Sequence, residues 1–205
     1  MILRLVILIL MSSVLGAGNR SEDVLHVRAG PAVVIDGKLT PGEWDSAQSL
    51  EIKIRPDWVV KVRFQHDAAN LYFAFQGLQH GKEMRFPELL VDSYRTRTVD
   101  WRPGDFWLHS SANLCEGEGE YNVYQKNGVF QCSQEKSGWS ANHFPLGGDS
   151  VMEILVSFSK LGIQSSKGMR IGFALDLTDT QNNWTFWPGK AQLAHPASWG
   201  AMLVE

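Results

Sequence analysis

Residues 60–77 read VKVRFQHDAANLYFAFQG, and this stretch decides the fold class. Apolar and polar side chains alternate on both sides of the turn signal DAAN at 67–70. The apolar positions are Val60, Val62, Phe64, Leu71, Phe73 and Phe75. Because successive side chains of a strand point to opposite faces of a sheet, this spacing predicts a hairpin with one buried face.

The same period of two recurs at residues 152–158 (MEILVSF) and 169–177 (MRIGFALDL). No long segment has the 3.6-residue period of an amphipathic helix, and turn signals such as KNG, PLGGD and SSKG separate the apolar runs. The pattern therefore predicts an all-β chain that folds as an antiparallel β-sandwich.

A Trp stands in the turn-rich stretch VVIDGKLTPGEWDSA at residues 33–47. Residues 33–35 are predicted to form a short strand. Thr40 and Pro41 have the residue types that begin a helix, so one short helical turn is expected near the N-terminus. That turn would lay Trp44 onto the sandwich as a core residue.

Residues 1–17 have the layout of a secretory signal peptide, because Arg4 is followed by an apolar run and then by small residues. The run is shorter than the roughly 20 residues that a spanning helix needs, and no later run is longer. We expect a secreted or periplasmic protein with one domain over 18–205 and no membrane span; a retained N-terminal anchor is the alternative. The formal net charge of -3 gives no electrostatic footprint for a nucleic-acid partner.

Cys115 and Cys132 are the only cysteines of the chain, and export makes a disulfide between them the expectation. Residues 121–132 read as a hairpin about KNG at 126–128. Its register places Cys132 opposite Asn122 and not opposite Cys115. The bridge therefore requires the EGEGE segment at 116–120 to fold back, which its two glycines allow.

Glu116, Glu118 and Glu120 recur at every second position of this segment. An extended backbone would place the three carboxylates on one side, and hard oxygen ligands at that density suit calcium. The alternative is a solvated acidic loop.

Six segments of this chain occur in the order found in family 9 carbohydrate-binding modules. They are IDGKLTPGEWDSA (35–47), the hairpin at 60–77, WRPGDFW (101–107), VSFSKLG (156–162), MRIGFALDLTD (169–179) and HPASWGAMLV (195–204). The chain thus resembles this family of DOMON-like β-sandwiches. The resemblance implies an exported, non-catalytic module that works beside polysaccharide-degrading enzymes, binds the end of a glucan or xylan between two Trp side chains, and often holds structural calcium.

A pyranose ring stacks its C–H face on an indole, while its hydroxyl groups need polar partners. Trp101 matches the family's first stacking Trp and stands outside the strand alternation, where a large aromatic has no evident packing role. Arg102 and Asp105 lie beside it and would bind the sugar hydroxyls. For Trp107, the core and the sugar site remain equally open.

The family's second stacking position is Leu193 here, so the sequence departs from the family pattern. Trp184 and Trp187, in NNWTFWPGK, are the candidates for a second stacking surface, although Trp187 also matches a Trp that looks structural in the family. Trp199 reads as a core residue. The departure at Leu193 leaves open a cell-surface interaction domain that has lost sugar binding.

Two further functions are weighed against sugar binding. Some DOMON-like domains hold a b-type haem for electron transfer, and the possible axial ligands here are Met84, Met152 or Met169 with His80 or His109. Met152 and Met169 fall on buried strand faces, where Met is ordinary packing. An enzyme is not expected, since the sequence has no GxSxG, HExxH, P-loop or CxxC motif; paired carboxylates in a cleft are the remaining catalytic alternative.

Overall fold

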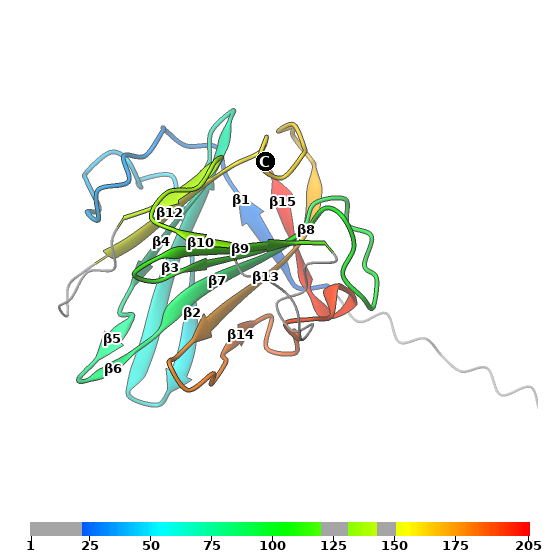
Figure 1. Ribbon diagram of the computed structural model, residues 1–205. Helices are drawn as coiled ribbons and strands as arrows, with labels where there is room; N and C mark the ends of the chain where they lie inside the picture. Colours follow the sequence, from blue (N-terminus) through cyan, green and yellow to red (C-terminus); the bar gives the residue numbers. More distant parts are fainter. Residues whose placement is uncertain (1–21, 120–130, 143–150) are drawn as a thin grey trace, which may run out of the picture.

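The computed structural model describes residues 22–119, 131–142 and 151–205, and they form two β-sheets that face each other (Figure 1). The strands of the larger sheet are β1 (Val24–Val27), β7 (Phe86–Asp92), β8 (Asp105–Ser110), β9 (Leu114–Glu118), β10 (Gln131–Ser133), β13 (Arg170–Thr178), β14 (Phe186–Trp187) and β15 (Gly200–Val204). The strands of the smaller sheet are β2 (Gln48–Arg55), β3 (Trp58–His66), β4 (Asn70–Gln76), β11 (Trp139–Ala141) and β12 (Val151–Ser157). A separate ribbon pairs β5 (Gln79–His80) with β6 (Glu83–Met84).

The larger sheet has the order β1-β15-β13-β7-β8-β9-β10, with β14 paired to β13. The smaller sheet has the order β11-β12-β4-β3-β2. β1 and β15 run parallel, and the other strand pairs of the described residues run antiparallel. The predicted all-β sandwich is confirmed, and so is the hairpin, which consists of β3 and β4.

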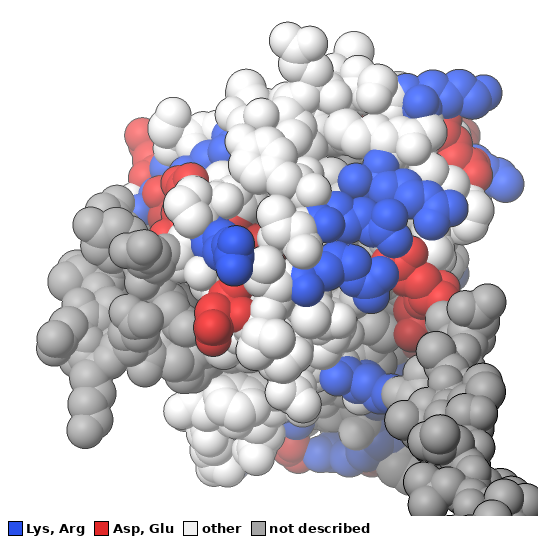
Figure 2. Space-filling model, turned by 90° about the vertical axis from the view of Figure 1, so that its right-hand side faces the viewer, with Lys and Arg blue, Asp and Glu red and all other residues white. Residues whose placement is uncertain are grey.

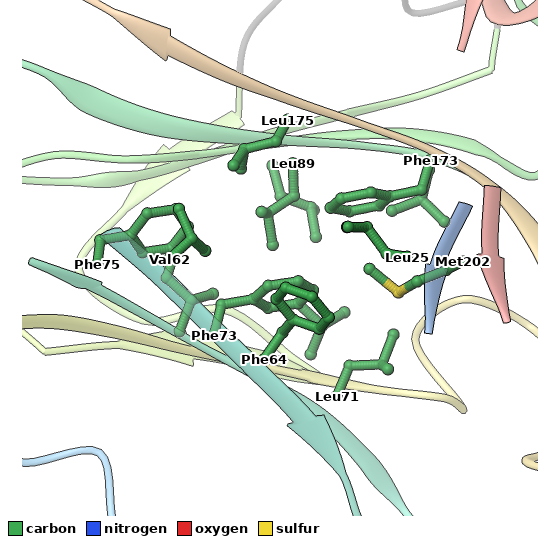
Figure 3. Close-up of a cluster of buried hydrophobic side chains, with 14 of the residues drawn as sticks. Leu25, Val62, Phe64, Leu71, Phe73, Phe75, Leu89, Phe173, Leu175 and Met202 are labelled. Carbon is green, nitrogen blue, oxygen red and sulfur yellow. The ribbon is translucent and has the colours of Figure 1, made fainter. Parts of the chain in front are cut away.

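The sandwich interior is filled by the alternating apolar side chains of both sheets (Figure 3). Phe73 of β4 stacks on Phe173 of β13 with ring centroids 5.7 Å apart, which joins the two layers. Leu89 and Leu175 lie above Phe75 and Val62 in the same cluster. Since odd-numbered residues of β7 and β13 face inward, their even-numbered residues face outward from the larger sheet.

The N-terminal stretch differs from its prediction in local structure. Residues 33–35 form no strand, and the expected helical turn is a set of hydrogen-bonded turns at 40–47. A 3-10 turn at Pro196–Ser198 is the only helical element of the described residues. The stretch between Val27 and β2 forms one parallel β-bridge, between Ala29 and His66 of β3, and then packs its side chains on the outer face of the smaller sheet.

Trp44 is a core residue, as predicted. It packs with Val33, Tyr72 and Val151 on the outer face of the smaller sheet. Its indole N–H donates to Glu153 Oε1 at 3.1 Å, so the buried ring also has its polar atom satisfied. Trp44 therefore fixes the N-terminal stretch to β4 and β12.

No helix within the described ranges is long and apolar enough to cross a bilayer.

Candidate functional site

A cavity of about 770 Å³ opens on the outward face of the larger sheet. Side chains of β7 and β8 form its floor, and the loop after β13 forms one wall. Its lining includes the aromatic and polar side chains of Phe86, Glu88, Trp107, His109, Asn182 and Trp184, and the Cys115–Cys132 disulfide lies at another side. Below, "the pocket" means this cavity.

Strand register explains why these side chains meet. Asp176 of β13 lies opposite Glu88 of β7, and Glu88 lies opposite His109 of β8. The same row continues to Cys115 of β9 and Cys132 of β10. Directly opposed residues of adjacent strands hold their side chains on one face, so five strands contribute to a single polar row beneath and beside the pocket.

The polar row contains two buried carboxyl groups in contact. Burial and the neighbouring Glu88 carboxylate raise the pKa of Asp176 to about 9. Glu88 Oε2 and Asp176 Oδ2 are buried, and neither receives a hydrogen bond from a donor of the described residues, because both are acceptors when ionised. A protonated Asp176 resolves this conflict by donating to Glu88, so the pair carries one negative charge at neutral pH.

His109 belongs to the polar row and, like Glu88, lines the pocket. Its Nδ1 lies 2.9 Å from Glu88 Oε1, and since an ionised carboxylate only accepts, the ring N–H donates. The ring also stacks on Trp107, with centroids 5.5 Å apart and planes 19° apart. Trp107 and His109 thus form a stacked aromatic pair in the lining of the pocket floor, and only 5% of the Trp107 surface is exposed.

Trp184 is the most exposed Trp of the described residues that line the pocket, at 45% of its surface. It stands in the wall, at the end of the loop that follows β13. It also lines a second, smaller cavity of about 350 Å³ together with Leu193 and His195. A large indole exposed between two cavities offers a contact surface for an apolar ligand face.

The loop that carries Trp184 is held by Arg85. This guanidinium is almost buried, donates from Nη1 to the Asn183 carbonyl at 2.6 Å, and lies 3.5 Å from Asp179. Asp179 in turn accepts hydrogen bonds from the backbone N–H groups of Gln181 and Asn183. The wall of the pocket is therefore pre-formed by hydrogen bonds within the protein.

Trp101 is buried, whereas the sequence predicted that it would be exposed at a sugar site. Only 6% of its surface is exposed, and it packs edge-to-face on Trp199 with centroids 5.7 Å apart. Leu90, Trp107 and Leu193 belong to the same apolar cluster. The expectation that Trp101 has no packing role is wrong, because the chain after β7 folds back over the outer face of the larger sheet and buries the indole there.

Arg102 and Asp105 form a hydrogen-bonded turn before and at the start of β8, and neither residue lines the pocket. Asp105 is 1% exposed, and its Oδ2 accepts the backbone N–H of Arg102 at 2.6 Å. Burial and the nearby Asp92 carboxylate raise the pKa of Asp105 to about 6, although the Arg102 N–H opposes the shift. Arg102 itself points to solvent. The prediction of these residues as hydroxyl partners beside an exposed Trp101 is therefore wrong in its geometry.

The remaining predicted aromatics divide between the pocket and the core. Trp107 faces outward from the sheet and lines the pocket, but it is only 5% exposed and packs in the same apolar cluster as Trp101. It therefore belongs to a core cluster and to the pocket lining, and its contact with sugar stays a prediction. Trp187 packs against the sandwich interior near Phe173, with centroids 6.3 Å apart, and does not line the pocket. Trp199 is buried, as predicted.

The predicted disulfide is present, but the predicted register is wrong. Cys115 and Cys132 are bonded, and they lie directly opposite each other in β9 and β10. β9 runs on to Glu118, so the acidic segment extends a strand before the chain turns at Gly119, whose φ is +56°. Asn122 and the expected hairpin turn lie outside the described residues.

The acidic segment does not fit a calcium site at Glu116. This carboxylate accepts the Trp139 indole N–H at 2.7 Å and pairs with Lys160 at 3.0 Å and Lys136 at 3.7 Å. Two ammonium groups already neutralise it, and a divalent cation would have to displace them. Glu118 is exposed, and Glu120 lies outside the described residues. Over the described ranges, no three His, Cys, Asp or Glu side chains are grouped as metal ligands.

The candidate haem ligands have other partners. His109 is bound to Glu88, and His80 stacks on Trp58 with centroids 5.5 Å apart and contacts Arg55. Met152 is fully buried in the sandwich interior. Met84 pairs with Gln79 across the ribbon of β5 and β6. Nothing in these contacts favours an axial ligand pair.

Three residues of the polar row were not predicted from the sequence: Glu88 and His109, which line the pocket, and Asp176, which is fully buried beside Glu88. A signal for two of them was present, since Glu88 in FPELLVD and Asp176 in MRIGFALDL interrupt strands that are otherwise apolar. A buried acidic group in a strand is more informative than an exposed apolar one.

No protein-family model matches the sequence, and no curated protein matches it significantly. Among solved structures, a family 9 carbohydrate-binding module from Caldicellulosiruptor kristjanssonii in complex with cellotriose matches at 14% identity and a TM-score of 0.62, over 89% of this chain and 94% of that chain. A family 9 module from the same organism in complex with glucose matches at 16% identity and a TM-score of 0.60, over 89% and 96% of the two chains. This chain therefore has the fold of family 9 carbohydrate-binding modules.

Proposed function

We propose that this protein is a non-catalytic carbohydrate-binding module whose sugar site is the pocket on the outward face of the larger sheet. The observation that carries the proposal is that one cavity is lined by an exposed indole, Trp184, and by the stacked pair of Trp107 and His109. A pyranose offers an apolar face to such rings and a rim of hydroxyls to polar neighbours.

The polar neighbours are present around the rim. Glu88 and His109 lie at the floor, and Thr178, Asp179 and Asn182 lie along the wall. These groups include acceptors and donors, which a sugar hydroxyl can use in either role. In this proposal Trp184, one of the two candidates for the second stacking surface, is the main stacking residue, with Trp107 beside it in place of Trp101.

The ligand we propose is a glucan-type oligosaccharide, with xylan as the related alternative. Support comes from the two structural neighbours, which are described in complex with cellotriose and with glucose. The volume of the pocket, about 770 Å³, is in the range of small-ligand sites and suits one or two sugar rings.

Export of the protein is part of the proposal. The disulfide between Cys115 and Cys132 supports an oxidising compartment. Residues 1–17 would be removed as a signal peptide, and residues 18–205 would form the single exported domain, outside the cell or in the periplasm.

A binding role is favoured over glycoside hydrolysis by the carboxyl geometry. Glycosidases hold two carboxyl groups roughly 5 to 10 Å apart so that the scissile bond fits between them. Glu88 and Asp176 instead touch, side by side on adjacent strands, and leave no room for a sugar between them. Their arrangement suits a fixed polar floor.

The test is isothermal titration calorimetry of cellotriose and xylotriose with the parent protein and with Trp184→Ala. Truncating an aromatic hot spot costs about 2 kcal/mol of binding free energy or more, so the dissociation constant should rise at least tenfold. The melting temperature should change little, because Trp184 is half exposed. The matched control is Tyr94→Ala, an exposed aromatic outside the pocket, which should bind like the parent. A parent protein that binds neither sugar would refute the proposed function and favour an interaction domain without sugar binding.

A further inference from the structure

We propose that the pocket selects uncharged sugars and rejects sugars that carry a carboxylate, and that Glu88 sets this selectivity. The inference rests on the proposed function, since it names the class of sugar that the same pocket takes. It follows from the charges around the pocket and from their burial.

The floor of the pocket holds a negative charge that cannot move away. Glu88 is 4% exposed, lies on a central strand, and is fixed between Asp176 and His109 by cross-strand pairing. Its Oε1 accepts the His109 N–H at 2.9 Å, while Oε2 has no donor other than the shared proton of Asp176 among the described residues. A buried, rigid carboxylate is poorly screened by solvent and by salt.

The wall adds a second carboxylate, Asp179, which is paired with Arg85. Burial raises the pKa of Asp179, but hydrogen bonds from Asn183 and Gln181 and the charge of Arg85 outweigh it, and the pKa falls below its usual range. Arg85 neutralises Asp179 from behind, at 3.5 Å, and does not line the pocket.

Among the described residues, no Lys or Arg lines this pocket. His109 is the only His of that described lining, and its Nδ1 is hydrogen-bonded to Glu88. A uronic acid would therefore bring a carboxylate against Glu88 with no opposite charge to offset the repulsion and the loss of hydration.

A neutral sugar carries no charge that Glu88 would repel. Its hydroxyl groups can donate to acceptors such as Glu88 and Asn182 and can accept from donors such as Thr178. Hydrogen bonds to a charged acceptor are stronger than those between neutral groups, so the same Glu88 that repels a carboxylate favours a hydroxyl.

The test compares two trisaccharides of the same length and linkage by titration calorimetry: cellotriose, and the β-1,4-linked trimer of glucuronic acid. The parent should bind the uronic acid trimer at least tenfold more weakly, a difference of about 1.4 kcal/mol. Equal or tighter binding of the uronic acid trimer would overturn the proposed selectivity and leave sugar binding intact. A parent that binds neither trimer would refute the underlying function instead. The same titrations of Trp184→Ala identify any binding outside the pocket, which is subtracted.

Two variants assign the selectivity to its residue. Glu88→Gln removes the charge at nearly constant shape, and the ratio of the two dissociation constants should fall toward one. The control Glu51→Gln changes an exposed carboxylate on the smaller sheet and should keep the parent ratio. Asp176→Asn should also keep it, because Asp176 is fully buried and does not line the pocket. An unchanged ratio in folded Glu88→Gln would overturn the assignment to Glu88. If Glu88→Gln does not fold, loss of selectivity in Asp176→Asn would contradict it instead.

Discussion

Asp176 and Glu88 bring two carboxyl groups together where both side chains are almost fully buried. Their contact lowers the free energy of unfolding by an amount that depends on pH. The unfolded chain releases the Asp176 proton near pH 4, whereas the folded chain holds it until about pH 9. Between these values the folded state binds one more proton than the unfolded state, so its stability falls as the pH rises.

Asp176→Asn should remove this pH dependence. Urea unfolding at pH 5, 7 and 9 should show that the free energy of unfolding of the parent declines more steeply than that of the variant. The groups that face Asp176 are Glu88 from β7 and the backbone N–H of Thr185 before β14, with His109 acting through Glu88. The exposed Asp45→Asn is the control and should follow the parent. Parallel curves for parent and Asp176→Asn would mean that Asp176 is ionised in the folded protein.

Single aromatic residues were the hardest to assign from the sequence. Trp44 and Trp101 both stand in turn-rich segments outside the strand alternation, yet both are 6% exposed. Trp44 was assigned correctly and Trp101 was not, because the sequence does not show that the segment between β7 and β8 covers the outer face of the larger sheet. Spacing along a strand predicts which face a residue takes; it does not predict which loop covers that face.

Trp101→Ala should therefore destabilise the fold instead of weakening sugar binding selectively. Removing a buried Trp costs roughly 3 to 5 kcal/mol of folding free energy. Chemical denaturation should show a loss of this size, and Trp44→Ala on the opposite sheet should show a similar one. A Trp101→Ala protein as stable as the parent would contradict a packing role for Trp101 and make it a candidate ligand contact again.

At the scale of elements, the pocket depends on a loop and on a strand pair. Arg85, from the short β6–β7 connection, holds the loop that ends in Trp184. β10 is joined to β9 by the disulfide and closes another side of the pocket. The strands themselves were predicted well, whereas the β9–β10 register was not. The alternation of apolar and polar residues predicts where a strand lies, but which residues it pairs with depends on the path of the chain between strands.

Arg85→Met should loosen the wall and weaken cellotriose binding. Ordering one side chain on binding costs about 0.5 to 1.5 kcal/mol, so the expected loss is roughly two- to tenfold in affinity. Because the loss acts through Trp184, Arg85→Met should have little further effect in a Trp184→Ala background. Arg55→Met removes the other guanidinium that lies over the Trp58 ring and is the matched control. Additive losses in the double variant would show that Arg85 does not position Trp184.

At the scale of the whole molecule, charge is distributed in a way that agrees with a neutral ligand. On the face shown in Figure 2, Lys and Arg side chains form a patch with acidic side chains beside it. Arg95, Arg97 and Arg170 pair with Glu22 in one ion-pair network. The described lining of the pocket has no Lys or Arg. The period of two predicted the sandwich, but which charged side chains lie near the pocket depends on the path of the chain, which the sequence does not display.

The central claim is that sugar binds on the outward face of the larger sheet between Trp107 and Trp184. A crystal structure of the protein with cellotriose tests it most directly. We predict a glucose ring stacked on the Trp184 indole, above the stacked pair of Trp107 and His109, with a hydroxyl within hydrogen-bond distance of Glu88 or His109. A trisaccharide bound elsewhere, or soaked crystals whose pocket holds no sugar at saturating concentration, would contradict the account.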